Sequence, residues 1–150
     1  MKQIRKRIGC LIIGLIGLSA CENYISSIPD MPVHLQLNLL TEYPHLKNNP
    51  NQCVIFERPR LVSDRIGFGG VLVYSDFYGD FHAFDLACPY EAVTSVKVVP
   101  DSLGYVICSQ CGEVYDISMG TGIPTKGICR EPLKRYVVRE MNNILYVSLR

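Results

Sequence analysis

Short runs in which hydrophobic and polar residues alternate occupy the chain from residue 32 onward. The clearest run is residues 33–39, where every second residue is apolar, so one side of an extended strand would face a core. Further short apolar runs are separated by Gly, Pro, Asn and Asp, which predicts more strands. The predicted strands are residues 33–39, 53–57, 71–74, 81–86, 95–99, 105–107, 114–117, 136–139 and 144–147.

These many short strands predict an all-β domain, a small sandwich or barrel. Turn residues at 76–80, 100–104 and 142–143 predict three hairpins. Residues 41–52 and 119–127 are predicted as loops, and residues 118–127 are long for a plain connector, which makes them a candidate site loop. The sequence has no convincing helical period and no internal repeat.

The first 20 residues follow a different pattern. Four basic residues precede an unbroken run of apolar and small residues at positions 8–20, which is typical of a secretory signal. This run is shorter than the about 20 residues that a membrane-spanning helix needs. The run ends in Leu-Ser-Ala before Cys21, which resembles a bacterial lipobox and implies cleavage there and a lipid on Cys21. An uncleaved anchor helix and an ordinary cleavable signal are the alternatives.

This reading divides the chain into a signal (1–20), a polar tether (21–31) and one domain (32–150). It predicts an exported lipoprotein on the periplasmic face of a membrane or on the cell surface. The whole chain has 15 basic and 14 acidic residues, and loss of the signal leaves 11 basic and 14 acidic ones, a net charge of −3. No basic stripe remains, which argues against nucleic acid as a partner.

Five cysteines remain after the signal and the lipidated residue are set aside. In an oxidising compartment an odd number leaves at least one that is free, bound to metal or paired outside the chain. One follows the predicted strand 81–86, and a Cys-x-x-Cys pair follows the strand 105–107. Two hairpin-tip loops of this kind can present several ligands to a metal. The five are Cys53, Cys88, Cys108, Cys111 and Cys129.

An ordered series of motifs extends over residues 72–149. In chain order its residues are Cys88 and Tyr90; Cys108, Cys111 and Gly112; Tyr115 and Asp116; Gly120, Gly122 and Pro124; Gly127, Ile128 and Cys129; and Leu133, Tyr136 and Val138. The series resembles the Rieske [2Fe–2S] domain. That family has a Cys-x-His loop, a Cys-x-x-His-Gly loop, an aromatic–Asp pair, a glycine-rich loop, a Gly-Pro-Ala segment over the cluster, and a Leu-x-x-Tyr-x-Val strand. The resemblance implies a Rieske-like β fold and an inherited electron-transfer role.

Both histidine ligands of that family are missing from this chain. Tyr90 and Cys111 stand in their places, and the chain's three histidines lie outside both loops. A cluster held by three cysteines and a tyrosinate would carry more negative charge than a Rieske centre. Its potential would lie nearer the ≈ −400 mV of all-cysteine ferredoxins than the ≈ −150 to +300 mV of Rieske centres. A standard Rieske cluster is therefore disfavoured, and the Tyr90 ring is expected to fill the space of the missing histidine.

Cys129 stands at the alanine position of the segment that covers the cluster in the family. If the fold is kept, Cys88, Cys108, Cys111 and Cys129 would meet in one pocket and suit zinc or an all-cysteine iron–sulfur centre. A metal-free site with a disulfide from Cys108 to Cys111 or to Cys88 is the alternative. A thioredoxin-type redox pair is less favoured because no helix follows the motif. Cys53 is expected to be a small buried hydrophobe.

Two classes of function remain open. The first is a membrane-tethered metal-binding or electron-transfer module with an unidentified redox partner. The second is a vestigial Rieske fold without a cluster, acting as a disulfide-stabilised binding or structural module. An independent enzyme is less favoured, because the chain has no recognisable nucleophile–base or carboxylate pair and lacks the catalytic domain of Rieske oxygenases.

Overall fold

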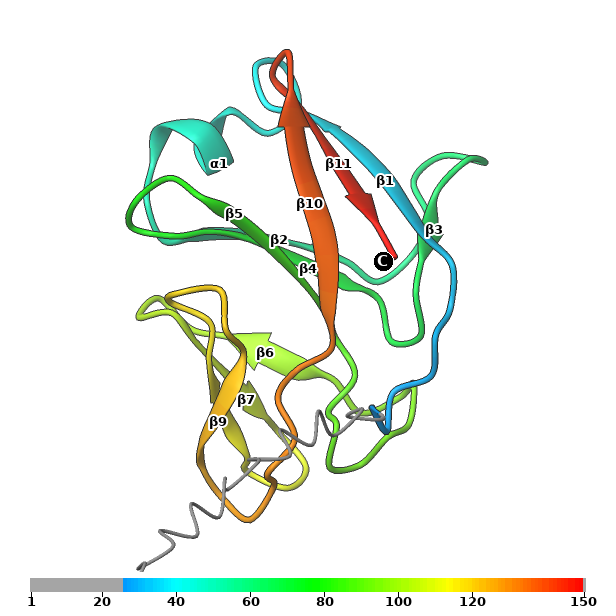
Figure 1. Ribbon diagram of the computed structural model, residues 1–150, viewed down its shortest axis with the longest axis vertical. Helices are drawn as coiled ribbons and strands as arrows, with labels where there is room; N and C mark the ends of the chain where they lie inside the picture. Colours follow the sequence, from blue (N-terminus) through cyan, green and yellow to red (C-terminus); the bar gives the residue numbers. More distant parts are fainter. Residues whose placement is uncertain (1–25, 150) are drawn as a thin grey trace, which may run out of the picture.

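The computed structural model describes residues 26–149, so the predicted signal, Cys21 and the first part of the tether lie outside the described residues. Apart from one short helix, the regular structure is β strand (Figure 1). The elements are β1 (Val33–Asn38), α1 (Pro44–Asn48), β2 (Gln52–Phe56), β3 (Arg65–Ile66), β4 (Val71–Ser75), β5 (Phe81–Asp85), β6 (Val98–Pro100), β7 (Tyr105–Cys108), β8 (Val114–Asp116), β9 (Ile123–Lys126), β10 (Arg135–Met141) and β11 (Ile144–Ser148).

The strands form two sheets with antiparallel pairing (Figure 1). The larger sheet has seven strands in the order β2-β4-β5-β10-β11-β1-β3, and the smaller has four in the order β6-β7-β8-β9. In Figure 1 the larger sheet curls in the upper half and the smaller sheet lies below it. The predicted all-β class is therefore confirmed. No helix within residues 26–149 is long and apolar enough to cross a membrane.

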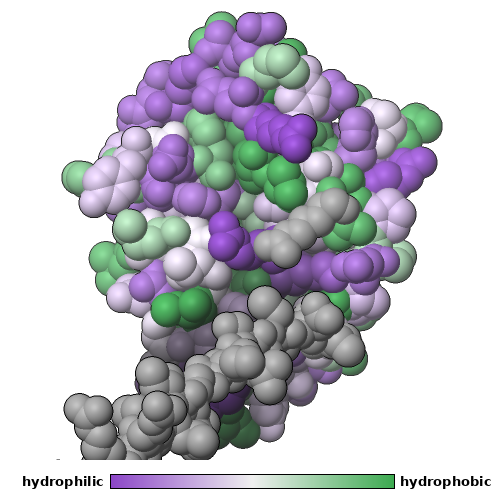
Figure 2. Space-filling model, viewed as in Figure 1, coloured by the Kyte–Doolittle hydropathy of each residue, from purple (hydrophilic) through white to green (hydrophobic). Residues whose placement is uncertain are grey.

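The alternating pattern of β1 places its side chains as predicted. Leu35 and Leu37 are fully buried, whereas His34 and Gln36 between them are exposed. Hydrophilic residues cover most of the upper part of the face in Figure 2, and the exposed apolar residues there form small patches. A strand with one buried side follows directly from this period of two.

β4 is buried on both of its sides because it separates two hydrophobic cores. Val71 and Val73 pack into the first core, which lies inside the curled larger sheet. Leu72 and Tyr74 point the other way, into a second core. The second core also contains strand residues of the smaller sheet, together with Cys88 and Cys108.

Three elements differ from the sequence predictions. Residues 41–52 are not wholly a loop, because α1 lies within them and buries Leu46. Pro44 begins this helix with its φ already restricted to the helical range, but five residues are too few to show a helical period. Residues 119–127 are not an open loop either, since β9 pairs with β8 there. The unpredicted β3 has only two residues and pairs with β1.

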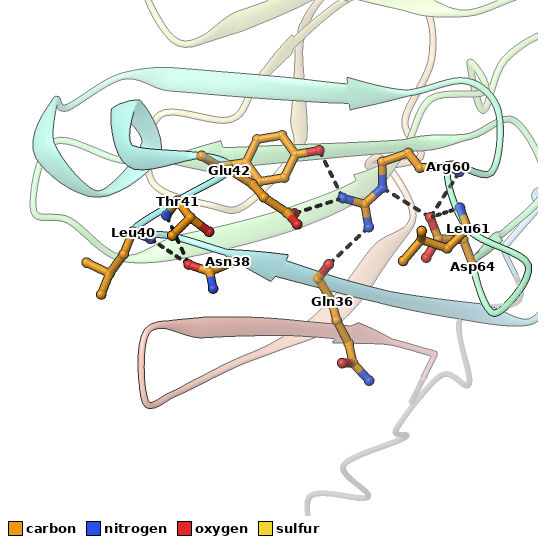
Figure 3. A network of polar contacts seen from close by, with 9 residues as sticks. Gln36, Asn38, Leu40, Thr41, Glu42, Arg60, Leu61 and Asp64 are labelled. Carbon is orange, nitrogen blue, oxygen red and sulfur yellow. Dashed lines mark hydrogen bonds and ion pairs between the residues drawn. The ribbon is translucent and has the colours of Figure 1, made fainter.

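Arg60 joins the segment after β2 to β1, as Figure 3 shows. Its Nη2 donates to the Gln36 carbonyl oxygen at 3.0 Å, and its Nε donates to Asp64 Oδ2 at 3.0 Å. Nη1 donates to the Tyr43 hydroxyl at 2.9 Å, and the guanidinium lies 4.9 Å from the centre of the Phe56 ring. Arg60 thereby links strands that share no backbone pairing.

Asp85 fixes the point at which the chain leaves the larger sheet towards Cys88. Its side chain is fully buried, and Oδ1 accepts hydrogen bonds from the N–H groups of Gly69 (2.9 Å) and Ala87 (2.7 Å). Oδ2 accepts from the Phe68 N–H at 3.0 Å and from the Tyr136 hydroxyl. One carboxylate thus ties β5 to the loop before β4 and to β10.

Replacing Asp85 with Asn should lower the free energy of unfolding by about 3 kcal/mol. The Asn side chain has only one acceptor oxygen, and its NH₂ group replaces the other. At least one buried N–H group therefore loses its acceptor and faces a second donor instead. Equilibrium urea unfolding measures the change. The matched control is Asp80→Asn at an exposed turn position, which should stay within about 0.5 kcal/mol. Equal effects of the two variants would contradict the role given to Asp85.

Candidate metal centre

Three cysteines from two separate loops meet at one end of the second core. Cys88 follows β5, Cys108 ends β7, and Cys111 lies in the turn between β7 and β8. Their three sulfur atoms all lie within 4.8 Å of one another, and Cys88 Sγ is 3.6 Å from Cys111 Sγ. Cys88 and Cys108 are fully buried, and Cys111 is partly exposed. All five cysteines of the described chain are free thiols.

The backbone around Cys88 forms a tight turn that points two N–H groups at its sulfur. The Ala92 N–H donates to the Cys88 carbonyl oxygen at 2.8 Å, and Ala92 has a φ of +51°. The backbone N–H groups of Tyr90 and Glu91 hydrogen-bond the Cys88 sulfur. Alanine in a left-handed conformation is uncommon, so the surrounding structure must hold this turn in place.

The backbone around Cys108 forms the same turn. The Gly112 N–H donates to the Cys108 carbonyl oxygen at 2.9 Å, and Gly112 has a φ of +74°. The N–H groups of Gln110 and Cys111 hydrogen-bond the Cys108 sulfur. Because such hydrogen bonds favour a negatively charged sulfur, each turn is arranged for a thiolate or a metal-bound sulfur.

The three thiols differ in their tendency to ionise. Burial raises the pKa of Cys88 and of Cys111, and the two neighbouring thiols raise that of Cys111 further. Burial also acts on Cys108, but the N–H groups of Cys111 and Gln110, together with the Cys111 and Cys88 thiols, outweigh it and lower its pKa. A bound cation would displace the protons of the thiols, because cysteine binds a metal ion as the thiolate.

Tyr115 places a hydroxyl group beside this cluster. Its oxygen lies 3.6 Å from Cys88 Sγ. The side chain is fully buried, and burial together with the Cys88 and Cys129 thiols raises its pKa. The sequence suggested only an architectural role for Tyr115. The structure adds a polar contact between its hydroxyl group and the Cys88 sulfur.

The structure does not bring Cys129 into the group of three sulfurs. Its thiol donates to the Glu131 carbonyl oxygen at 3.5 Å. Its backbone N–H donates to Glu113 Oε1 at 3.0 Å. A centre with four cysteine ligands would require Cys129 to leave these partners and move towards the cluster.

Glu113 is a buried residue that binds the backbone of residues 127–129. Its side chain is 1% exposed, and Oε1 accepts hydrogen bonds from the N–H groups of Ile128 and Cys129. Oε2 is buried and has no hydrogen-bond partner among the described residues. Gly127 lies directly against the carboxylate, since an added Cβ would be 2.2 Å from it. Sequence reasoning missed Glu113, whose only signal was an acidic residue beside a predicted metal loop.

The end of the predicted tether packs against both sides of the site. Ile28 is 1% exposed, and its carbonyl oxygen accepts from Lys134 Nζ at 2.7 Å. The Ser27 hydroxyl donates to the Pro89 carbonyl oxygen at 2.8 Å, next to Cys88. The Ser26 hydroxyl donates to Glu131 Oε1 at 2.9 Å. Residues 26–28 are thus part of the folded domain.

Of the remaining residues, Tyr90 lies in the Cys88 loop, whereas Cys53 and His82 lie on strands. Tyr90 is 49% exposed, and the expectation that its ring fills the space of the missing histidine stays a prediction. Cys53 lies on β2 and packs, partly buried, against the second core. His82 Nε2 is 2.9 Å from Asp76 Oδ2. Within residues 26–149, no histidine belongs to the sulfur group.

Comparisons with known proteins return structural similarity only. No protein-family model matches the chain, and no curated protein matches it. The solved structures that resemble it include a ferredoxin chain in a complex of reduced oxygenase and oxidized ferredoxin in carbazole 1,9a-dioxygenase. That chain has a TM-score of 0.46 and 19% identity, with 67% of this chain and 82% of that chain covered.

Two further ferredoxins are similar at the same level. The ferredoxin of Sphingomonas yanoikuyae B1 has a TM-score of 0.44 and 18% identity, covering 68% of this chain and 89% of that one. The ferredoxin of carbazole 1,9a-dioxygenase from Nocardioides aromaticivorans IC177 has a TM-score of 0.45 and 19% identity, covering 68% and 88%. With TM-scores below 0.5, these matches do not assign the chain to a family.

Replacing Gly127 with Ala should destabilise the segment over the site by about 3 kcal/mol. The new Cβ would collide with the buried Glu113 carboxylate, and φ at this position is +116°. Gly79→Ala is the matched control, because Gly79 also has a positive φ but open space around it; it should cost about 1 kcal/mol. Urea unfolding and the alkylation rate of Cys129 report the two effects. Equal losses in both variants would show that the contact with Glu113 is unimportant.

Proposed function

We propose that this domain is a metal-binding module whose ligands include Cys88, Cys108 and Cys111. The observation that carries the proposal is the convergence of three sulfurs within 4.8 Å, from loops that are twenty residues apart in sequence. Two of these sulfurs also receive pairs of backbone N–H groups. Thiolates in such a group suit zinc, iron or an iron–sulfur centre.

The residues present do not match a Rieske cluster. That centre needs two imidazoles on its second iron, and no histidine of the described chain reaches the sulfurs. A single ion matches better. Four ligands placed tetrahedrally at the Zn–S distance of ≈ 2.3 Å would lie about 3.8 Å apart, close to the 3.6 Å between Cys88 and Cys111 sulfurs. Ligands divided between two irons would lie farther apart.

The metal decides between the two roles that the proposal covers. Iron in a thiolate site changes its oxidation state by one electron, whereas zinc does not. The ordered resemblance of residues 72–149 to the Rieske domain supports an electron-transfer role with a protein redox partner. The lipobox-like sequence supports a site of action at a membrane surface, with the lipid on Cys21.

A metal-free module held by a disulfide is the second candidate. It is favoured by one observation, the 3.6 Å approach of the Cys88 and Cys111 sulfurs. Moving these atoms to the ≈ 2.05 Å of a disulfide would need only a small rearrangement of two loops. The fold would then serve binding or structure.

Metal analysis of the full-length protein, purified anaerobically in detergent, separates these candidates. We expect about one metal ion per chain, with the three cysteines protected from alkylation until the metal is removed. Cys108→Ser should weaken metal affinity at least about 100-fold, because it removes a buried ligand. Cys53→Ser is the control and should leave binding unchanged. Metal-free protein with oxidised Cys88 and Cys111 would refute the metal-binding proposal.

The proposed membrane anchor predicts a separate result for Cys21. In cells fed a labelled fatty acid, the full-length protein should carry the label and sediment with membranes. Cys21→Ser should lose the label, since the thioether to the lipid cannot form. Cys10→Ser alters a cysteine inside the predicted signal and should keep the label. Labelling that survives Cys21→Ser would contradict the lipoprotein proposal without affecting the metal site.

A further inference from the structure

The two cysteine loops are copies of one turn, and this repetition identifies positions that correspond. In each loop the fourth residue after the cysteine has a positive φ and donates its N–H to the cysteine carbonyl oxygen. In each loop the second and third residues after the cysteine direct their N–H groups at the cysteine sulfur. The backbone path from Cys88 to Ala92 therefore matches the path from Cys108 to Gly112.

Corresponding positions should point their side chains in corresponding directions. The second residue after each cysteine is exposed: Tyr90 in one loop and Gln110 in the other. The third residue of the second loop is Cys111, whose sulfur belongs to the cluster. The third residue of the first loop is Glu91. The repeated turn thus gives Glu91 the position that corresponds to a ligand, and gives Tyr90 the position that points outward.

The Glu91 carboxylate is free to take this role. It is half-buried, and it makes no hydrogen bond or ion pair with any residue in the range 26–149. Its carboxylate oxygens do not belong to the group of atoms within 4.8 Å of one another, so the side chain would have to turn towards the three sulfurs when a metal binds. The Cys129 thiol, in contrast, donates to the Glu131 carbonyl oxygen, and the Tyr90 side chain is 49% exposed.

We propose that Glu91 is the fourth donor of a mononuclear site completed by Cys88, Cys108 and Cys111. This inference rests on the proposed metal-binding function and names the ligand that the three sulfurs lack. A single divalent ion bound tetrahedrally by three thiolates and one carboxylate oxygen matches the donor types that zinc and ferrous iron accept.

Cobalt(II) titration of the full-length protein in detergent tests this ligand, because tetrahedral cobalt gives visible bands and a sulfur-to-cobalt absorption that grows with each thiolate. Glu91→Ala should weaken Co²⁺ binding at least about tenfold while the sulfur-to-cobalt intensity per bound ion stays the same. Glu91→Cys should restore tight binding and raise that intensity by about one third, since four thiolates replace three. Tyr90→Phe and Cys129→Ser should leave affinity and spectrum unchanged.

The failures of the two proposals look different. If Co²⁺ and Zn²⁺ bind the wild-type protein with a tetrahedral spectrum but Glu91→Ala matches it in affinity, the Glu91 assignment falls and the metal-binding function stands. Loss of about a quarter of the sulfur-to-cobalt intensity in Cys129→Ser would instead identify four thiolates with Cys129 as the fourth. If the reduced wild-type protein binds neither ion, the mononuclear site with Glu91 falls; if the anaerobically purified protein also contains no iron or zinc, the metal-binding function falls with it.

Discussion

The candidate site depends on one constraint: two pairs of backbone N–H groups must point at two buried sulfurs. Each pair requires a turn whose fourth residue after the cysteine adopts a left-handed conformation, at Ala92 in one loop and Gly112 in the other. Such turns are held only if both ends of the loop are fixed. Cys88 and Cys108 fix the first residue of each turn, because both are fully buried in the second core, and the N–H groups of Ala92 and Gly112 tie the fourth residue back to them. The sulfurs of the candidate metal site are therefore also part of the packed core.

The larger sheet acts as a rigid support for this arrangement. β4 contributes alternate side chains to both cores, so the sheet cannot shift without disturbing the core beneath the cysteines. Asp85 fixes the exit of β5 three residues before Cys88 by accepting hydrogen bonds from two neighbouring segments. The smaller sheet fixes Cys108 through the pairing of Val98 with it. The Cys88 loop is also tied to the segment leading into β6, since the Cys88 N–H donates to the Val96 carbonyl oxygen and the Val98 N–H to that of Leu86. The site therefore lies where the two sheets meet.

The sequence predicted what depends on local pattern and missed what depends on distant contacts. The alternation in residues 33–39 and the hairpins before Cys88 and Cys108 predicted the strands and the approach of the three sulfurs. α1 and β9 were missed because five and four residues carry too little periodicity, and Pro124 inside β9 argued against a strand. The contacts of Glu113 could not be predicted, because its partners are about 15 residues away in the sequence. The repeated turn could not be predicted either, because alanine at position 92 gives no sign of a left-handed backbone. Cys129 was grouped with the others from family position alone, and the hydrogen bonds to Glu113 and Glu131 hold it apart.

The charge of the site separates this protein from the family that its sequence resembles. Neutral imidazoles reduce the negative charge of a Rieske centre, whereas three thiolates and a carboxylate around a divalent ion would leave a net charge of about −2. Negative charge stabilises the oxidised state of a redox metal and so lowers its reduction potential. Iron in this site would therefore be a better electron donor than acceptor. The packing of Ser27 against Pro89 and of Ser26 against Glu131 adds a geometric consequence. Because these residues follow Cys21 by only five and six positions, a lipid on Cys21 would hold the metal loops close to the membrane surface, where a membrane-bound partner could reach them.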